Sequence, residues 1–87
     1  MNKQYRFDHN VIYGLIQAGN SVLDLGCGNG ELLSKLIRHK DVQALGIEKD
    51  FDLVAEVIAR GVPVLHSDLD EGLAGLPDLF FDYVILE

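Results

Sequence analysis

The hydrophobic pattern of the chain alternates between helical spacing and short continuous apolar runs, which are typical of helices and buried strands respectively. The predicted helices cover residues 7–19, 31–40 and 50–61. The predicted strands cover residues 21–26, 42–48, 62–68 and 80–87. Gly19 and Gly61 supply stop signals, and Asp50 or Asp52 caps the third helix. Residues 69–79 form a turn-rich connection with room for a short helix.

Strands that alternate with helices predict an α/β fold, in which a parallel sheet carries helices on both faces. Right-handed crossovers leave few topologies open to such a chain. With 87 residues, the chain is at most one small domain.

Composition excludes several kinds of partner. The chain has 14 acidic and 7 basic side chains and a net charge of −7, which argues against nucleic acid and anionic membranes. The N-terminus lacks the apolar core of a signal peptide, and no run is long enough to span a membrane. Cys27 is the single cysteine, and His9, His39 and His66 show no metal-ligand spacing, so we expect no disulfide and no metal site. A cytoplasmic location is the simplest interpretation.

The stretch SVLDLGCGNGELL, residues 21–33, places Gly26, Gly28 and Gly30 directly after a predicted strand. A strand-to-helix loop of an open α/β sheet lies at the carboxyl edge, where such folds bind ligands. Glycine there accepts positive φ values and lets a ligand lie against the backbone, while the following helix directs N–H groups at it. Three glycines in five residues exceed what a tight turn needs, so we predict a ligand site.

The residues around the loop narrow the ligand class. A dinucleotide fingerprint reads GxGxxG, but this chain gives GxGxG and has Glu31 at the sixth position. Glu31 and Asp24 would both repel a pyrophosphate. A ligand with a cationic or amino group therefore fits better, and a nicotinamide-cofactor Rossmann domain is the weaker alternative.

VLDLGCGNG resembles the first motif of the class I S-adenosylmethionine (SAM)-dependent methyltransferases. The resemblance implies the first four strands, in the order 3-2-1-4, of a seven-stranded Rossmann-like sheet ordered 3-2-1-4-5-7-6. Residues 1–87 would then be the SAM-binding N-terminal part of a methyltransferase-like domain, a fragment of a longer fold. SAM or S-adenosylhomocysteine (SAH) would be the ligand. No catalytic residue can be assigned.

The same resemblance assigns roles to residues at three strand ends. Glu48 would accept hydrogen bonds from the ribose hydroxyls, Asp68 would bind the adenine amino group, and the Leu69 N–H would face an adenine ring nitrogen. Cys27 would contribute packing or its backbone rather than a nucleophile, because no base is near it in sequence. The expected cofactor-binding residues are Asp24, Gly26, Cys27, Gly28, Gly30, Glu48, Asp68 and Leu69. Asp82 matches the family's fourth motif, or is a turn residue.

VLDLGCGNGELL, GIEKD and ARGVPVLHSDLDEGLAGLPDLFFDYVIL together look like the MetW-type methionine-biosynthesis proteins, a branch of this fold. Their pattern GDLDEGL…FPD.SFDYVILS appears here as SDLDEGLAGLPDLFFDYVILE, with Ser67 in place of the commoner Gly. The resemblance implies a role in methionine biosynthesis, with two alternatives open. The chain is a methyltransferase or its cofactor half, or it is an inactive SAM-binding regulatory partner of a homoserine acyltransferase. We expect no methyl transfer by the 87-residue chain alone.

The last predicted strand carries the run Tyr83, Val84, Ile85 and Leu86, which is typical of a strand buried on both faces. In the order 3-2-1-4 this strand lies at an edge, and an open edge is a template for pairing with another chain. We therefore expect that the chain self-associates through residues 80–87, with two-fold pairing as the simplest closed form, or that it is only marginally stable as a monomer.

Overall fold

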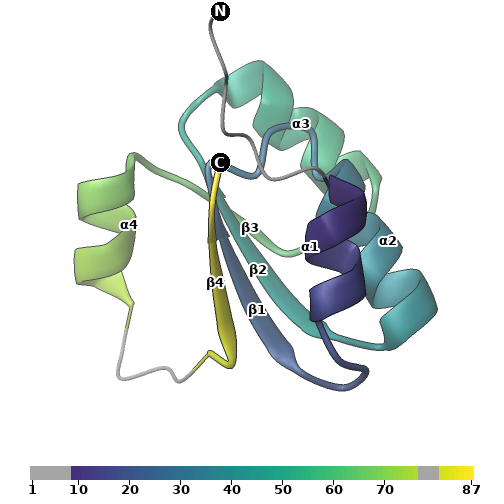
Figure 1. Ribbon diagram of the computed structural model, residues 1–87. Helices are drawn as coiled ribbons and strands as arrows, with labels where there is room; N and C mark the ends of the chain where they lie inside the picture. Colours follow the sequence, from purple (N-terminus) through teal and green to yellow (C-terminus); the bar gives the residue numbers. More distant parts are fainter. Residues whose placement is uncertain (1–8, 77–80) are drawn as a thin grey trace, which may run out of the picture.

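A computed structural model describes residues 9–76 and 81–87 of the chain (Figure 1). Its elements are α1 (His9–Leu15), β1 (Ser21–Leu25), α2 (Glu31–Lys40), β2 (Gln43–Glu48), α3 (Phe51–Ala59), β3 (Val64–His66), α4 (Leu69–Gly75) and β4 (Tyr83–Leu86). The strands form one sheet in the order β3-β2-β1-β4, and every pair is parallel. The predicted α/β class and strand order are therefore confirmed.

Several element boundaries differ from the prediction. The first helix ends at Leu15, and the chain turns at Gly19, whose φ of 80° is left-handed. The third strand ends at His66, two residues earlier than predicted. Asp50 is the N-cap of α3, because its carboxylate accepts hydrogen bonds from the first-turn N–H groups. Residues 7, 8 and 80 of the predicted elements lie outside the described residues.

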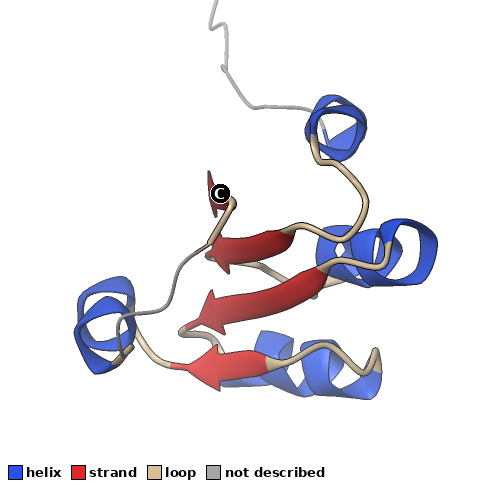
Figure 2. Ribbon diagram, turned by 90° about the horizontal axis from the view of Figure 1, so that it is seen from below, coloured by secondary structure: helices blue, strands red, loops and turns tan. Residues whose placement is uncertain are grey.

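Helices cover both faces of the sheet: α1, α2 and α3 lie on one side and α4 on the other (Figures 1 and 2). The larger core forms between the sheet and the first three helices. Its buried residues are Ile16, Val22, Cys27, Leu32, Leu33, Leu36, Val42, Val57, Val62 and Ile85. The smaller core, under α4, consists of Leu23, Leu25 and Ile47. The alternation along β1 divides its side chains between the two cores, as a strand's period of two requires.

Strand β4 is covered on only one face, although its apolar run is typical of a strand that is buried on both faces. Ile85 is buried in the larger core, whereas Val84 is 56% exposed and Leu86 is 73% exposed on the other face. The reason is the position of α4, which packs over β2: a Cβ on Gly72 would lie 3.0 Å from Ile47. Helix α4 therefore shields the inner strands and leaves the outer face of β4 open.

Asp82 fastens β4 to β1 at the amino edge of the sheet. Its Oδ2 accepts hydrogen bonds from the Ser21 N–H at 2.8 Å, the Ser21 hydroxyl at 3.2 Å and the Asn20 amide at 3.2 Å. The Ser21 N–H bond, followed by those from the two side chains, lowers the pKa of the Asp82 carboxyl. Asp82 lies before β4, so in this structure it is a turn residue that aligns two strands.

A substitution at Gly46 tests the packing between β2 and the glycine loop. A Cβ at this position would lie 2.6 Å from the Cys27 sulfur and 3.1 Å from the Cys27 Cβ. We expect Gly46→Ala to lower the free energy of unfolding by about 1–3 kcal/mol in urea titrations, because the buried thiol must move. The control is Gly14→Ala in α1, where a Cβ meets nothing within 4 Å. It should be neutral or stabilising by about 0.5–1 kcal/mol. Equal stability of Gly46→Ala and wild type would contradict this packing.

Candidate functional site

The glycine loop between β1 and α2 has the backbone that its sequence predicts. Gly26, Gly28 and Gly30 have φ values of 78°, 61° and 81°, all in the left-handed region that favours glycine. The Gly26 N–H donates to the Ile47 carbonyl at 2.8 Å, which holds the loop against the end of β2. A Cβ on Gly30 would lie 3.1 Å from Val57, but one on Gly28 would meet nothing within 4 Å. Gly28 is therefore the point where a ligand can approach the backbone.

Cys27 packs inside the protein and is not placed as a nucleophile. Its side chain belongs to the larger core and fills the space beside Gly46. Burial, assisted by the nearby Asp24 carboxyl, raises the pKa of the thiol to about 12. The thiol is thus neutral at ordinary pH, as the packing interpretation expects.

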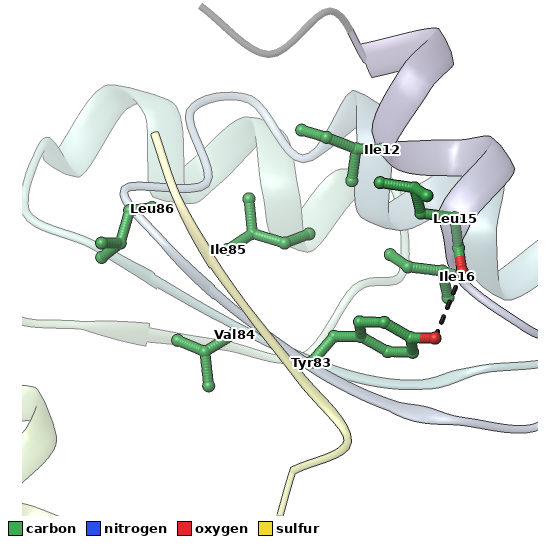
Figure 3. Close-up of a pocket in the computed structure, with 7 residues that line it drawn as sticks. All are labelled: Ile12, Leu15, Ile16, Tyr83, Val84, Ile85 and Leu86. Atoms are coloured by element: carbon green, nitrogen blue, oxygen red, sulfur yellow. Dashed lines mark hydrogen bonds between the residues drawn. The ribbon is translucent and has the colours of Figure 1, made fainter.

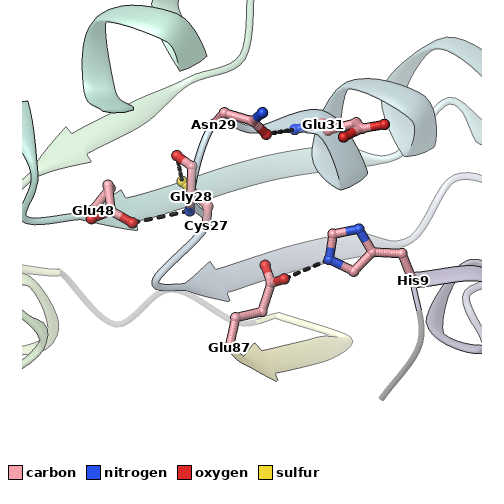
Figure 4. Close-up of polar contacts among 7 residues, drawn as sticks. All are labelled: His9, Cys27, Gly28, Asn29, Glu31, Glu48 and Glu87. Carbon is pink, nitrogen blue, oxygen red and sulfur yellow. Dashed lines mark hydrogen bonds and ion pairs between the residues drawn. The ribbon is translucent and has the colours of Figure 1, made fainter. Parts of the chain in front are cut away.

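Glu48 binds the backbone of two loops with its nearly buried carboxylate (Figure 4). Its Oε1 accepts a hydrogen bond from the Gly28 N–H at 3.0 Å. Its Oε2 accepts from the N–H groups of Lys49 and Asp50, each at 3.0 Å. The structure therefore brings Glu48 and the glycine loop together and gives Glu48 a positioning role that sequence reasoning did not foresee. Ribose binding by Glu48 stays a prediction.

Asp24 is the most unusual polar group among the described residues. Its side chain is 0% exposed, and neither carboxyl oxygen has a hydrogen-bond partner within the protein. Burial, followed by the neighbouring Glu87 and Glu48 carboxylates, raises the pKa of Asp24 to about 9. Asp24 is therefore a neutral acid at pH 7. A buried polar group without a partner costs free energy, and groups of this kind are concentrated at binding sites.

Asp68 and Leu69 lie at the same carboxyl edge, just after β3. Asp68 is the N-cap of α4, because its Oδ1 accepts a hydrogen bond from the Glu71 N–H at 2.7 Å. Leu69 is the first residue of that helix and is 44% exposed. The Ser67 N–H donates to the Glu48 carbonyl at 3.0 Å, so this loop is linked to the end of β2. Adenine binding by Asp68 and Leu69 stays a prediction.

The structure adds two residues that the sequence analysis did not select. Glu87 follows β4 at the carboxyl edge, and its Oε1 lies 2.7 Å from Nε2 of His9 at the start of α1 (Figure 4). The available signal was positional: Glu87 ends a strand predicted to lie beside the strand that carries Asp24. The His9 contact spans 78 positions of sequence and left no local pattern.

Comparison with known proteins shows to which family the chain belongs. A family model described as methionine biosynthesis protein MetW matches residues 6–87. The chain belongs to the MetW family. A bifunctional methionine biosynthesis protein MetXA/MetW from Rhodopirellula baltica is 40% identical over 91% of this chain and 14% of its own length. This MetW-family chain thus spans a small part of that relative.

Solved structures show the same fold as this MetW-family chain. A SAM-dependent methyltransferase from Geobacter sulfurreducens, in complex with SAH, superposes with a TM-score of 0.71 and 23% identity, covering 86% of this chain and 32% of that one. TrmK of M. capricolum, also with SAH, gives a TM-score of 0.78 and 17% identity, covering 93% and 40%. The fold is that of the class I methyltransferases, of which this chain matches a part.

Two further observations apply to residues 9–76 and 81–87 only. None of the helices in these ranges is both long and apolar enough to cross a membrane. Within the same ranges, no group of three or more His, Cys, Asp or Glu side chains could hold a metal ion.

The burial of Asp24 predicts how stability depends on pH. The folded protein keeps the Asp24 proton up to a pKa of about 9, whereas the unfolded chain loses it near the ordinary value of 3.8. Stability from this group is present at low pH and is lost as pH rises between these values, by up to about 1.4 kcal/mol per pH unit. Asp24→Asn should flatten the fall in unfolding free energy from pH 5 to pH 8, measured in urea. Exposed Glu56→Gln is the control. Parallel pH profiles for wild type and Asp24→Asn would show that Asp24 is ionised in the folded protein.

Proposed function

We propose that the chain is a SAM- and SAH-binding, methyltransferase-like domain that acts in methionine biosynthesis. The observation that carries this proposal is the glycine loop with three left-handed glycines, flanked by Asp24 on β1 and Glu48 on β2 at the carboxyl edge. Open α/β sheets bind ligands at that edge. The MetW family, named for methionine biosynthesis, supports the biological assignment.

The chemistry of the loop favours a ligand with a positive charge. Asp24 is buried without a partner and can accept a hydrogen bond from an ammonium, which would stabilise its charged form. Glu48 presents a second carboxylate beside Gly28. Glu31 opens α2, where it would repel a phosphate. SAM and SAH carry an amino-acid ammonium and no phosphate, whereas a nicotinamide dinucleotide brings a pyrophosphate, so the dinucleotide reading is disfavoured.

The proposed contacts follow the edge of the sheet from β1 to β3. The Gly26–Gly30 loop lies against the ligand through its backbone, with Cys27 contributing only its main chain. Glu48 accepts hydrogen bonds from the ribose hydroxyls while it holds the Gly28 N–H. Asp68 and the Leu69 N–H contact the adenine ring from the start of α4. The solved neighbours from G. sulfurreducens and M. capricolum are complexes with SAH, which supports this ligand class.

A second function, that of a regulatory partner without turnover, is supported by one observation. The relative from R. baltica is named as a bifunctional MetXA/MetW protein, which is compatible with a homoserine acyltransferase as partner. Capture of such an acyltransferase by the chain would favour this function, whereas methyl transfer from radiolabelled SAM by the chain would favour a methyltransferase. A cytoplasmic location stays a prediction from the sequence.

Ligand binding is tested by calorimetry with SAH and with NAD. We expect SAH to bind and NAD not to bind. Gly28→Val should abolish SAH binding, because a branched side chain enters the open space beside the loop and its φ of 61° is unfavourable for valine. Glu48→Ala should weaken SAH binding by about 1.5–3 kcal/mol, the scale of hydrogen bonds to a charged group. Glu56→Ala, exposed on α3, should bind like wild type. Binding of NAD without binding of SAH would overturn the proposed ligand.

Strand β4 supports a proposal about assembly as well. A groove of about 290 Å³ lies between α1 and β4 (Figure 3). Its lining residues are Ile12, Leu15, Ile16, Tyr83, Val84, Ile85 and Leu86. The Tyr83 hydroxyl donates to the Leu15 carbonyl at 3.2 Å, which holds the two walls of the groove together. Among the described strands β4 pairs with β1 alone, so its second edge can pair with β4 of another copy.

Self-association is tested by light scattering over a range of protein concentrations. Because Ile85 belongs to the core, the informative substitution is Leu86→Lys, whose side chain is 73% exposed beside the open edge. We expect the wild-type chain to form dimers at micromolar concentration and Leu86→Lys to be monomeric. Ile58→Lys, at a 63% exposed position on α3, should leave the dimer intact. A wild-type chain that is monomeric throughout, with the same melting temperature as Leu86→Lys, would contradict the proposal.

A further inference from the structure

Three carboxyl groups lie on one face of the sheet, at the carboxyl ends of three neighbouring strands. Asp24 on β1 is in register with Gly46 on β2 and with Ile85 on β4. Side chains alternate between the faces of a strand, so the residues two positions further, Glu48 and Glu87, share the face of Asp24. The Glu87 N–H still donates to the Leu25 carbonyl at 3.0 Å, so the alignment extends beyond β4. Asp24 therefore lies between two other acids.

The three acids differ in what compensates their charge. Glu48 accepts hydrogen bonds from three backbone N–H groups. Glu87 has His9 within 2.7 Å. Asp24, the central and fully buried member, has no hydrogen-bond partner for either oxygen. A buried carboxylate with two acidic neighbours and no donor is expensive to ionise, so the group keeps its proton until a donor arrives.

The titratable groups that surround Asp24 favour its protonated form. The Glu87 and Glu48 carboxylates both raise the pKa of Asp24, after the larger effect of burial. Cys27, the other titratable group packed there, has a pKa of about 12 and stays a neutral thiol. The surroundings of Asp24 thus favour its protonated form at pH 7, and an incoming cation would favour its charged form.

The contact between His9 and Glu87 lies at the edge of the cluster formed by the three acids. Figure 4 shows the contact between the two side chains. The His9 side chain is 46% exposed and the Glu87 side chain 22% exposed, so this contact is partly open to water. The contact joins the start of α1 to the end of β4, and so places the Glu87 carboxylate beside the end of the strand that pairs with β1.

We propose that His9 and Glu87 make ligand binding at Asp24 proton-linked: the ammonium of the ligand replaces the Asp24 proton, which leaves to water. This rests on the proposed function, because it takes the ligand to carry an amino-acid ammonium. The step balances in protons. Before binding there are a neutral Asp24 carboxylic acid and a ligand ammonium; after binding there are a carboxylate–ammonium pair and one proton released to water. Glu87 and His9 are positioning residues: Glu87 favours the protonated form of the free site, and His9 holds Glu87 in place.

The proposed linkage predicts in which direction the affinity for SAH changes with pH. Because binding expels a proton, the affinity for SAH should rise with pH, by up to about tenfold per pH unit between pH 6 and pH 8. Calorimetry at about pH 7 in phosphate and in Tris, which differ in ionisation enthalpy, should give about one proton released per SAH bound. 5′-Methylthioadenosine, which has the nucleoside but no amino-acid group, should bind without proton release.

Variants separate the linkage from ordinary structural support. Glu87→Gln should release fewer protons per SAH than wild type and should flatten the pH profile, whereas Glu56→Gln should change neither. His9→Ala should act like Glu87→Gln, and His9→Gln, which can still donate to Glu87, should restore proton release. SAH binding without proton release, or equal release by wild type and Glu87→Gln, would overturn this inference and leave the proposed function standing. Failure of SAH to bind the wild-type chain would overturn the proposed function itself.

Discussion

Strand β1 pairs in parallel with β2 on one side and β4 on the other, and the rest of the described structure is placed by those two pairings. Its alternating side chains enter both cores, which fixes its register to the sheet. The same register sets Asp24 between the ends of β2 and β4. The constraint that builds the fold thus also brings a buried acid to the edge where ligands bind.

The glycine loop converts this position into a candidate site. Left-handed glycines turn the chain sharply from β1 into α2, and Gly28 leaves its outer side open. Glu48 holds the Gly28 N–H, so the protein's own hydrogen bonds fix the backbone of the loop at the ligand edge. A site arranged in advance loses less conformational freedom on binding, which favours affinity. The Asp24 carboxyl has no hydrogen-bond partner within the protein, and a cationic ligand would supply one.

Features set by local chemistry could be predicted from the sequence. Left-handed turns at Gly26, Gly28 and Gly30 follow from residue type, and the sequence limits the cap of α3 to Asp50 or Asp52, of which the structure has Asp50. Features set by distant packing could not. The open face of Val84 and Leu86 depends on α4 lying over β2, and the contact between His9 and Glu87 joins residues far apart in the chain. The cap formed by Asp68 was hidden because β3 ends two residues before it.

The central claim is that the glycine loop and its carboxylates bind an amino-acid-bearing nucleoside. The most direct measurement is a titration of the ¹⁵N-labelled chain with SAH, following the backbone amide resonances of Gly26, Gly28 and Gly30. The account predicts saturable shifts of these three amides and of Glu48, with small changes at Gly14 on α1, and no comparable shifts with NAD. Glycine-loop amides that do not move at saturating SAH, or that move with NAD instead, would contradict it.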